Sequence, residues 1–125
     1  MRDEKVIQIR PVIELIDSDG IEKFQNDTLR PILKFQSPIT QRLLTGSNHF
    51  LQMLEKINPE DKKAYEDIVN KYVNFNVVFK NRLVGIVVGF FTHDELSFYM
   101  EYTKELNKRI INMQIKRFVD NKFSI

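Results

Sequence analysis

The stretch RLVGIVVGFFTHDELSFY, residues 82–99, decides which fold the chain is expected to adopt. Its residues 83–91 carry no charge, and Gly85 and Gly89 lie four positions apart within them. Four structures suit such a run: a membrane helix, a buried strand, a phosphate-binding loop, or a helix packed closely against another helix. The run is about half as long as a membrane-spanning helix requires, which excludes the first.

The apolar residues around this run follow a helical period that begins well before it. Valine and isoleucine favour strands, but successive apolar positions here are three or four apart, as on a helix face packed against another helix. NPED, residues 58–61, is typical of a helix start, with a cap, a first-turn proline and two acidic residues. We therefore predict one long helix from there to Gly89. Its apolar face is Ala64, Ile68, Tyr72, Phe75, Phe79, Leu83, Ile86 and Phe90.

The second half of the stretch starts another helix. Thr92 and Glu95 form the Thr-x-x-Glu pattern of a capping box, so we expect Gly89 to close one helix and Thr92 to open the next. Each of the two helices would span about 30 residues, or about 45 Å at 1.5 Å per residue. Since a short link joins them, we expect antiparallel neighbours. The apolar face of the last helix is Leu96, Tyr99, Thr103, Leu106, Ile110, Met113 and Arg117.

Two prolines interrupt the helical pattern of the N-terminal half. A helix start is indicated at Asp19, and the apolar stripe after it passes Pro31, which we expect to bend the helix because proline has no N–H to donate. Ser37 and Pro38 indicate a second start, as a cap and a first-turn proline.

The predicted fold is all-α: an elongated up-down bundle of three to four helices, with residues 18–125 forming a single domain. Residues 1–17 are predicted to be an extended N-terminal arm, because their apolar residues have no helical period and Pro11 interrupts them. Such an arm would lie on the helices or pair with a second copy of the chain.

Composition restricts the class of protein further. A chain of 125 residues is most simply one domain, and 42% hydrophobic with 29% charged residues is typical of globular proteins. The absence of cysteine excludes disulfides, thiolate metal sites and cysteine nucleophiles. The N-terminus has mixed charge and no apolar core of signal-peptide length. We expect a cytoplasmic protein that does not span a membrane.

The charge of the chain is uneven. The net charge of +2 is too small to indicate a polyanionic partner by itself. Residues 104–125, however, hold six basic residues and two acidic ones. A solvated helix end explains this excess, since cations are favourable near a helix C-terminus. A nucleic-acid surface over residues 104–122 is the weaker alternative.

The two glycines need a physical reason. Gly85 within a helix costs about 1 kcal/mol relative to alanine. Close approach of another helix at Gly85 and Gly89, within the subunit or across a homodimer, is the simplest compensation, and a ligand over Gly85 is the alternative. A phosphate loop is disfavoured because the lysine-serine/threonine end of that motif is missing.

Catalytic and metal-binding patterns are weak throughout the chain. His49 and His93 have no second histidine four residues away, so no helical two-histidine zinc site is indicated. The serines lack the context of an activated nucleophile, and the carboxylates fall mostly on polar faces or at helix starts. We predict no catalytic residue, no metal and no cofactor.

Polar residues beside the apolar faces are the best binding candidates. Asn26 and Arg30 are spaced four apart, Arg82 lies within the long apolar helix, and Arg109 lies near the last apolar face. Arg30, Arg82 and Arg109 are predicted either to converge on a small anionic ligand or to form a structural ion-pair network that fixes the helix register.

Three stretches carry a resemblance to a known family. FQNDTLRPILKFQ, RLVGIVVGFFTHDELSFY and NKRIINMQIKRF together cover about a third of the chain, and they resemble a family of short bacterial helical proteins without an established function. Some members carry a "glyoxalase" label. The glyoxalase I type of fold has βαβββ units with His and Glu metal ligands on strands, whereas this chain predicts helices, so the resemblance carries no catalytic residue across.

The sequence thus indicates a small cytoplasmic helical protein that acts as a binding or interaction module and self-associates as a homodimer. The dimer is inferred from the N-terminal arm, the long apolar faces and the glycine pair. The alternative function is an enzyme or ligand-binding protein with an anion-binding pocket near Arg30, Arg82 and Arg109.

Overall fold

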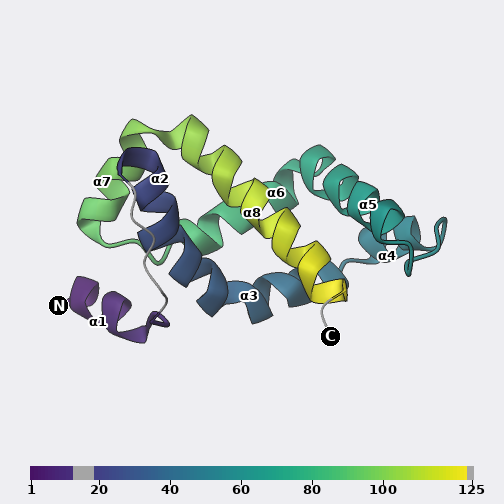
Figure 1. Cartoon of the computed structure of the whole chain (residues 1–125), viewed down its shortest axis with the longest axis horizontal. Helices are drawn as coiled ribbons and strands as arrows, with labels where there is room; N and C mark the ends of the chain where they lie inside the picture. Colours follow the sequence, from purple (N-terminus) through teal and green to yellow (C-terminus); the bar gives the residue numbers. More distant parts are fainter. Residues whose placement is uncertain (13–18, 124–125) are drawn as a thin grey trace.

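The computed structural model describes residues 1–12 and 19–123, and within them every regular element is a helix. The all-α class predicted above is therefore confirmed (Figure 1). No helix in this part of the chain is both long and apolar enough to cross a membrane. In order, the elements are α1 (Arg2–Ile9), α2 (Gly20–Phe24), the π-helix η1 (Gln25–Leu29), α3 (Arg30–Thr45), α4 (Asn48–Leu54), α5 (Lys62–Phe75), α6 (Val77–Val88), α7 (His93–Glu101) and α8 (Thr103–Phe123).

The last helix, α8, organises the fold. It runs diagonally across the molecule in Figure 1 and packs against α3, α5, α6 and α7. Its apolar positions recur every three or four residues, which places them on the buried side of the helix. The buried residues of α8 are Leu106, Ile110, Ile111, Gln114, Ile115, Phe118 and Val119.

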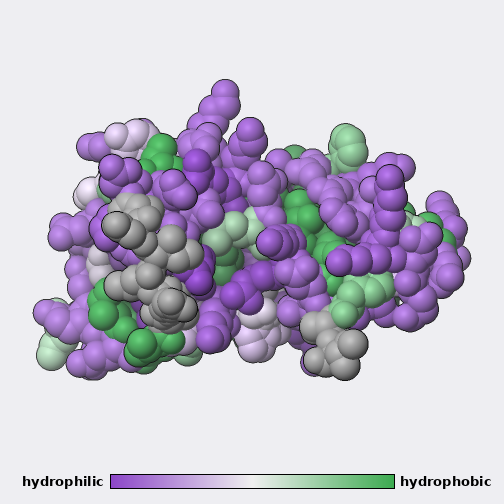
Figure 2. All heavy atoms as spheres, viewed as in Figure 1, coloured by the Kyte–Doolittle hydropathy of each residue, from purple (hydrophilic) through white to green (hydrophobic). Residues whose placement is uncertain are grey.

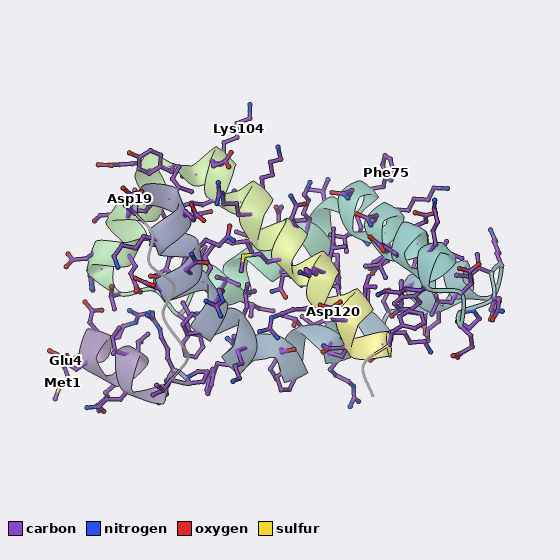
Figure 3. The ribbon with its side chains drawn as sticks, in the orientation of Figure 1. Met1, Glu4, Asp19, Phe75, Lys104 and Asp120 are labelled. Carbon is purple, nitrogen blue, oxygen red and sulfur yellow. The ribbon has the colours of Figure 1, made fainter. Side chains whose placement is uncertain are left out.

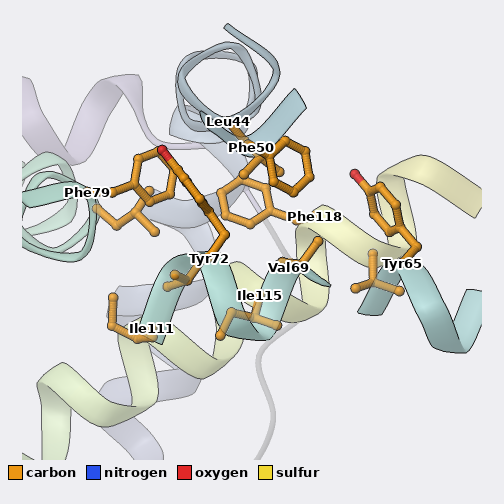
Figure 4. Close-up of a cluster of buried hydrophobic side chains, with 12 residues drawn as sticks. Leu44, Phe50, Tyr65, Val69, Tyr72, Phe79, Ile111, Ile115 and Phe118 are labelled. Atoms are coloured by element: carbon orange, nitrogen blue, oxygen red, sulfur yellow. The ribbon is translucent and has the colours of Figure 1, made fainter. Parts of the chain in front are cut away.

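The core consists of two hydrophobic clusters that α8 connects. The first, shown in Figure 4, joins α4, α5 and the start of α6 to the C-terminal half of α8. Its rings meet edge-on or tilted, with Tyr72 and Phe79 at 4.9 Å between centroids and Phe50 and Tyr72 at 5.4 Å. The second cluster joins α2, η1 and the start of α3 to the end of α6 and the N-terminal half of α8. Val84 of α6 packs against both clusters.

Two prolines lie in the continuous segment formed by α2, η1 and α3. The π-helix ends immediately before Arg30 and Pro31, so the irregular turn coincides with the place where proline removes a backbone donor. Pro38 lies inside α3, and the prediction that Ser37 and Pro38 start a new helix is wrong. The Thr40 hydroxyl donates to the Ser37 carbonyl at 3.1 Å, within the turn that holds the proline.

Both of the long helices predicted for the C-terminal half are interrupted. The first begins at Lys62 with Asp61 as its cap, and it breaks at Asn76, where φ is −116° and ψ is 93°. The Asn76 side chain accepts a hydrogen bond from the Phe79 N–H at 3.0 Å and so caps α6. The second predicted helix breaks at Tyr102, between α7 and α8. Two antiparallel helices of about 30 residues are therefore not what the chain forms.

The capping box between α6 and α7 is confirmed. The Thr92 hydroxyl accepts from the Glu95 N–H at 3.2 Å, and Glu95 Oε1 accepts from the Thr92 N–H at 2.8 Å. The two residues satisfy each other's free backbone donors, as the Thr-x-x-Glu pattern predicts.

The N-terminal arm differs from its prediction. Arg2–Ile9 form the helix α1, with Asp3 and Glu4 in its first turn, where acidic side chains are favourable. The extended conformation predicted for this segment is therefore wrong over α1, although Arg10 has an extended backbone with φ −71° and ψ 140°. Positions 13–17 of the predicted arm lie outside the described residues.

The surface mixes hydrophilic residues with separate apolar patches. The face shown in Figure 2 is mostly hydrophilic, and the hydrophobic side chains on it do not form one continuous area. Among the most exposed large hydrophobic residues are Phe75, Val77 and Val78, at 85%, 67% and 62%. Phe75 was predicted to pack on another helix, and that prediction is wrong because the break at Asn76 follows it directly.

Candidate functional site

The π-helix η1 is the most irregular element of the described chain. Asn26, Thr28 and Leu29 are buried in it, and Arg30 follows at the start of α3. A π-turn inside an α-helix is rare and is frequently found at a functional site, because the extra residue redirects the side chains around it. The surroundings of η1 are therefore the first place to look for a site.

A basic pocket of about 440 Å³ opens between this π-turn and the C-terminal half of α8. Gln25 and Arg30 line one side. The side formed by α8 presents Met113, Lys116, Arg117, Asp120 and Asn121. Asp120 is the one carboxylate among these described residues, against three cationic side chains.

The positive charges of this pocket are incompletely compensated. The Nη1 atom of Arg30 is buried and has no hydrogen-bond partner in the described part of the chain. Burial lowers the pKa of the Arg117 guanidinium, Asp120 opposes that shift, and the nearby positive charge of Arg30 adds to it. The two positively charged guanidinium groups repel each other, and an anion bound between them would offset that repulsion.

Gln25 is held in place by a contact outside the pocket. Its Oε1 accepts a hydrogen bond from Arg109 Nη1 at 2.9 Å, and Arg109 Nε donates to Glu105 Oε1 at 3.0 Å. Arg109 is therefore already engaged, and it orients a residue of the pocket wall.

The structure gathers only part of the predicted binding set. Arg30 lines the basic pocket, and Arg109 reaches it through Gln25. Arg82 is exposed on α6 and is not part of the pocket wall. Asn26 is buried within the π-turn, at 6% exposure.

Lys116 and Arg117 were missed as members of the site. A signal for them existed in the sequence. Arg117 falls on the apolar face of the last helix, four positions after Met113, and both residues lie in the basic segment 104–122.

The predicted close packing at the glycines is not found among the residues that the structure describes. Gly85 is exposed, and a Cβ atom added there would have no described atom of another segment within 4 Å. At Gly89 the added atom would lie 3.2 Å from the Gly85 carbonyl oxygen, within the same helix end. An approach by a second copy of the chain remains a prediction.

A second polar cluster attaches α1 to the turn between α6 and α7. Arg2 donates to the carbonyls of Phe91 at 2.7 Å and Gly89 at 2.8 Å. Arg10 donates to the Phe90 carbonyl at 2.6 Å and forms an ion pair with Glu95. These contacts satisfy carbonyl groups of the turn between α6 and α7, outside both helices.

Glu95 is the centre of that cluster. Burial raises the pKa of its carboxyl, but hydrogen bonds from Arg10, the Thr92 N–H and the Thr28 hydroxyl outweigh burial, so the pKa is lowered overall. Since Thr28 belongs to η1, Glu95 connects the π-turn, α7 and the N-terminal segment. Its role in the capping box was predicted, whereas its bond to Arg10 was not.

The histidines occupy peripheral positions. His93 begins α7, where Asp3 accepts from its backbone N–H at 3.2 Å, and His49 lies against Tyr72 with 5.7 Å between ring centroids. Among the described residues, no three His, Asp or Glu side chains are grouped as a metal site requires.

Comparisons with known proteins return no match. No protein-family model matches the chain, and no curated protein or solved structure matches it either. The function is therefore argued from the geometry described above.

Proposed function

We propose that the protein binds a small anionic molecule, carrying a phosphate or carboxylate group, in the basic pocket beside the π-turn. The observation that supports this most directly is the buried Nη1 atom of Arg30, which has no partner in the described chain and belongs to a side chain that lines the pocket together with Lys116 and Arg117. A buried donor without a partner is costly, and a charged one more so. An anion in the pocket would supply the missing acceptor.

The chemistry of the pocket suits binding more than catalysis. Its described wall offers cations, two side-chain amides and one carboxylate. A guanidinium can hold a phosphate or carboxylate through two parallel hydrogen bonds, and the Lys116 ammonium adds a point charge. Asp120 would repel a second negative group nearby, or accept a hydrogen bond from a ligand hydroxyl. The proposed function is accordingly ligand binding.

Isothermal titration calorimetry tests this proposal. The purified chain is titrated with inorganic phosphate, pyrophosphate and citrate. We expect at least one of them to bind, and we expect Arg30→Gln and Arg117→Gln each to weaken its binding by about tenfold, the loss of a charge-assisted hydrogen bond. Arg42→Gln is the matched control, because Arg42 is exposed on α3. Binding that is unchanged in both pocket variants, or absent for all three anions, contradicts the proposal.

A second candidate function is self-association through the exposed face of α6. The observation that favours it is the open space at Gly85 on the same helix as the exposed Val77 and Val78. Small and apolar residues on one helix face allow a second helix to approach closely. Sedimentation equilibrium tests this homodimer. We expect Val78→Glu to yield monomers and the control Met100→Glu, at an equally exposed position, to leave the dimer intact. A monomeric wild-type chain in the micromolar range rejects the idea.

A cytoplasmic location and membership of the bacterial helical family are also proposed, on the composition and the three stretches quoted above. Fractionation of cells that express the chain tests the location, since recovery in the membrane or secreted fraction would contradict it.

A further inference from the structure

A second cationic depression lies between α6 and the N-terminal half of α8, apart from the basic pocket. It has a volume of about 320 Å³. Lys80 and Asn81 of α6 line it on one side, and Lys104, Lys108 and Asn112 of α8 line it on the other. Val84 and Ile111 add apolar surface to the groove.

The lysines of this groove have no internal counter-charge. Among residues 1–12 and 19–123, no side chain or backbone group pairs with the ammonium group of Lys80, Lys104 or Lys108, and no described carboxylate lines the groove. Other lysines of the chain do have such partners, since Lys23 pairs with Asp27 and Lys122 with Glu60. The ammonium groups of the groove are therefore available to pair with the carboxylates of another molecule.

An apolar shoulder stands next to the groove. Phe75, Val77 and Val78 flank the helix break at Asn76, and all three are exposed by more than half. Asn74 and Lys80, which bracket these residues in sequence, both line the groove. In Figure 3 the side chains of Phe75 and Lys104 project from the same edge of the molecule. A cluster of large exposed apolar side chains beside unpaired charges is typical of an interaction surface.

We propose that this groove and its shoulder form a docking surface for an acidic, amphipathic segment of a partner protein. Carboxylates of the segment would meet Lys80, Lys104 and Lys108, and an aliphatic or aromatic side chain would cover Phe75 and the two valines. The distance from Lys104 to Asn112 along α8 is about 12 Å, which matches about two turns of a helix. The partner is a short segment, with one anchor and a few charges.

The same residues fit a nucleic acid less well. Three cations would release about three counterions, so binding of a nucleic acid would be weak at physiological salt. Stacking of successive bases needs several aromatic faces, and the shoulder offers one ring and two aliphatic side chains. A peptide uses both the charge of the groove and the aliphatic part of the shoulder.

Panning a library of random peptides of about 12 residues, long enough to cover the groove, tests this surface. The full chain is the bait, and Lys104→Glu/Lys108→Glu is the comparison. We expect peptides rich in Asp and Glu with interspersed Leu or Phe to be enriched on the wild type and lost on the double variant. Failure to enrich any peptide, or enrichment of peptides without acidic residues, would overturn the proposal.

Fluorescence anisotropy with the most enriched peptide gives the quantitative test. We expect the double variant to weaken binding at least about tenfold and Phe75→Ser about fivefold, effects typical of interface charges and anchors. Lys5→Glu/Lys56→Glu is the matched control, with the same charge change at exposed positions outside the groove. An equal loss in the control would show that net charge alone governs binding. An oligothymidylate that binds as tightly as the peptide, insensitive to Phe75→Ser, would identify a nucleic-acid surface instead. Either result rejects the docking proposal.

Discussion

Arg10 forms two hydrogen bonds with Glu95 through the terminal nitrogens of its guanidinium, Nη1 to Oε2 at 2.9 Å and Nη2 to Oε1 at 2.6 Å. The two residues are 85 positions apart in the sequence. The pair is largely shielded, with side-chain exposures of 7% and 16%. Paired hydrogen bonds between a guanidinium and a carboxylate are among the strongest polar contacts in proteins. This contact attaches the segment after α1 to the turn that begins α7.

Removing the Glu95 charge should destabilise the fold strongly. Glu95→Gln leaves Arg10 buried without a counter-charge, and loss of one partner of a buried ion pair costs about 3 kcal/mol. Urea denaturation followed by circular dichroism measures the free energy of unfolding. Glu101→Gln is the matched control, because Glu101 is exposed at the end of the same helix. If Glu95→Gln lowers the free energy of unfolding no more than the control does, the ion pair contributes little to stability.

The Glu95 carboxylate should also make the free energy of unfolding depend on pH. The pKa of Glu95 is lowered in the folded chain from its ordinary value of 4.5. The contribution of the ionised Glu95 to the free energy of unfolding is therefore complete at pH values above the ordinary pKa. It is lost as the pH falls through the lower pKa of the folded state. We expect the difference in unfolding free energy between the wild type and Glu95→Gln to stay constant from neutral pH down to the ordinary pKa of 4.5, and to shrink as the pH falls below it. A difference that stays constant down to the acid unfolding transition would contradict this assignment.

The break between α5 and α6 should depend on its cap. Asn76→Ala removes the acceptor of the Phe79 N–H, and loss of an N-cap side chain costs about 1 kcal/mol. Thermal unfolding monitored by circular dichroism measures the effect. In the control Asn74→Ala, an exposed side chain near the end of α5 is removed instead, and we expect little change there because alanine favours helix. Equal effects at the two positions would argue against capping by Asn76.

Gly85 offers a test that separates folding from self-association. The site is exposed and has room for a Cβ atom, so Gly85→Ala should stabilise the monomer by up to about 1 kcal/mol through higher helix propensity. If α6 is a dimer contact, the same substitution should weaken the dimer. Chemical denaturation and sedimentation equilibrium report the two effects separately. Destabilisation of the monomer would show that something in the chain approaches Gly85 after all.

Local patterns in the sequence predicted the helical class and the start of α7. The capping box of Thr92 and Glu95 involves residues three apart, so its hydrogen bonds depend only on local backbone geometry. The apolar spacing of α8 likewise identified buried residues such as Ile110, because a helix face repeats with a known period.

The helix breaks were missed for a physical reason. An interruption of one residue at Asn76 leaves the apolar steps on either side three or four apart, so the pattern from Tyr72 to Phe79 looks uninterrupted. The exposure of Phe75 then follows from the break. The helical conformation of α1 was also missed, because contacts with the α6–α7 turn support a short segment whose apolar residues have no helical period.

By itself, the sequence determined that the chain is helical and that Leu106 and Ile110 of α8 face the core, since both depend on local propensity and periodicity. Only the tertiary structure decided which charges share a site. Arg30 lies near Arg117 because α3, which begins at Arg30, packs against α8, and Arg82 is left outside because α6 presents it to solvent. Spacing along a chain places residues on a face, whereas the meeting of two faces depends on how whole helices pack.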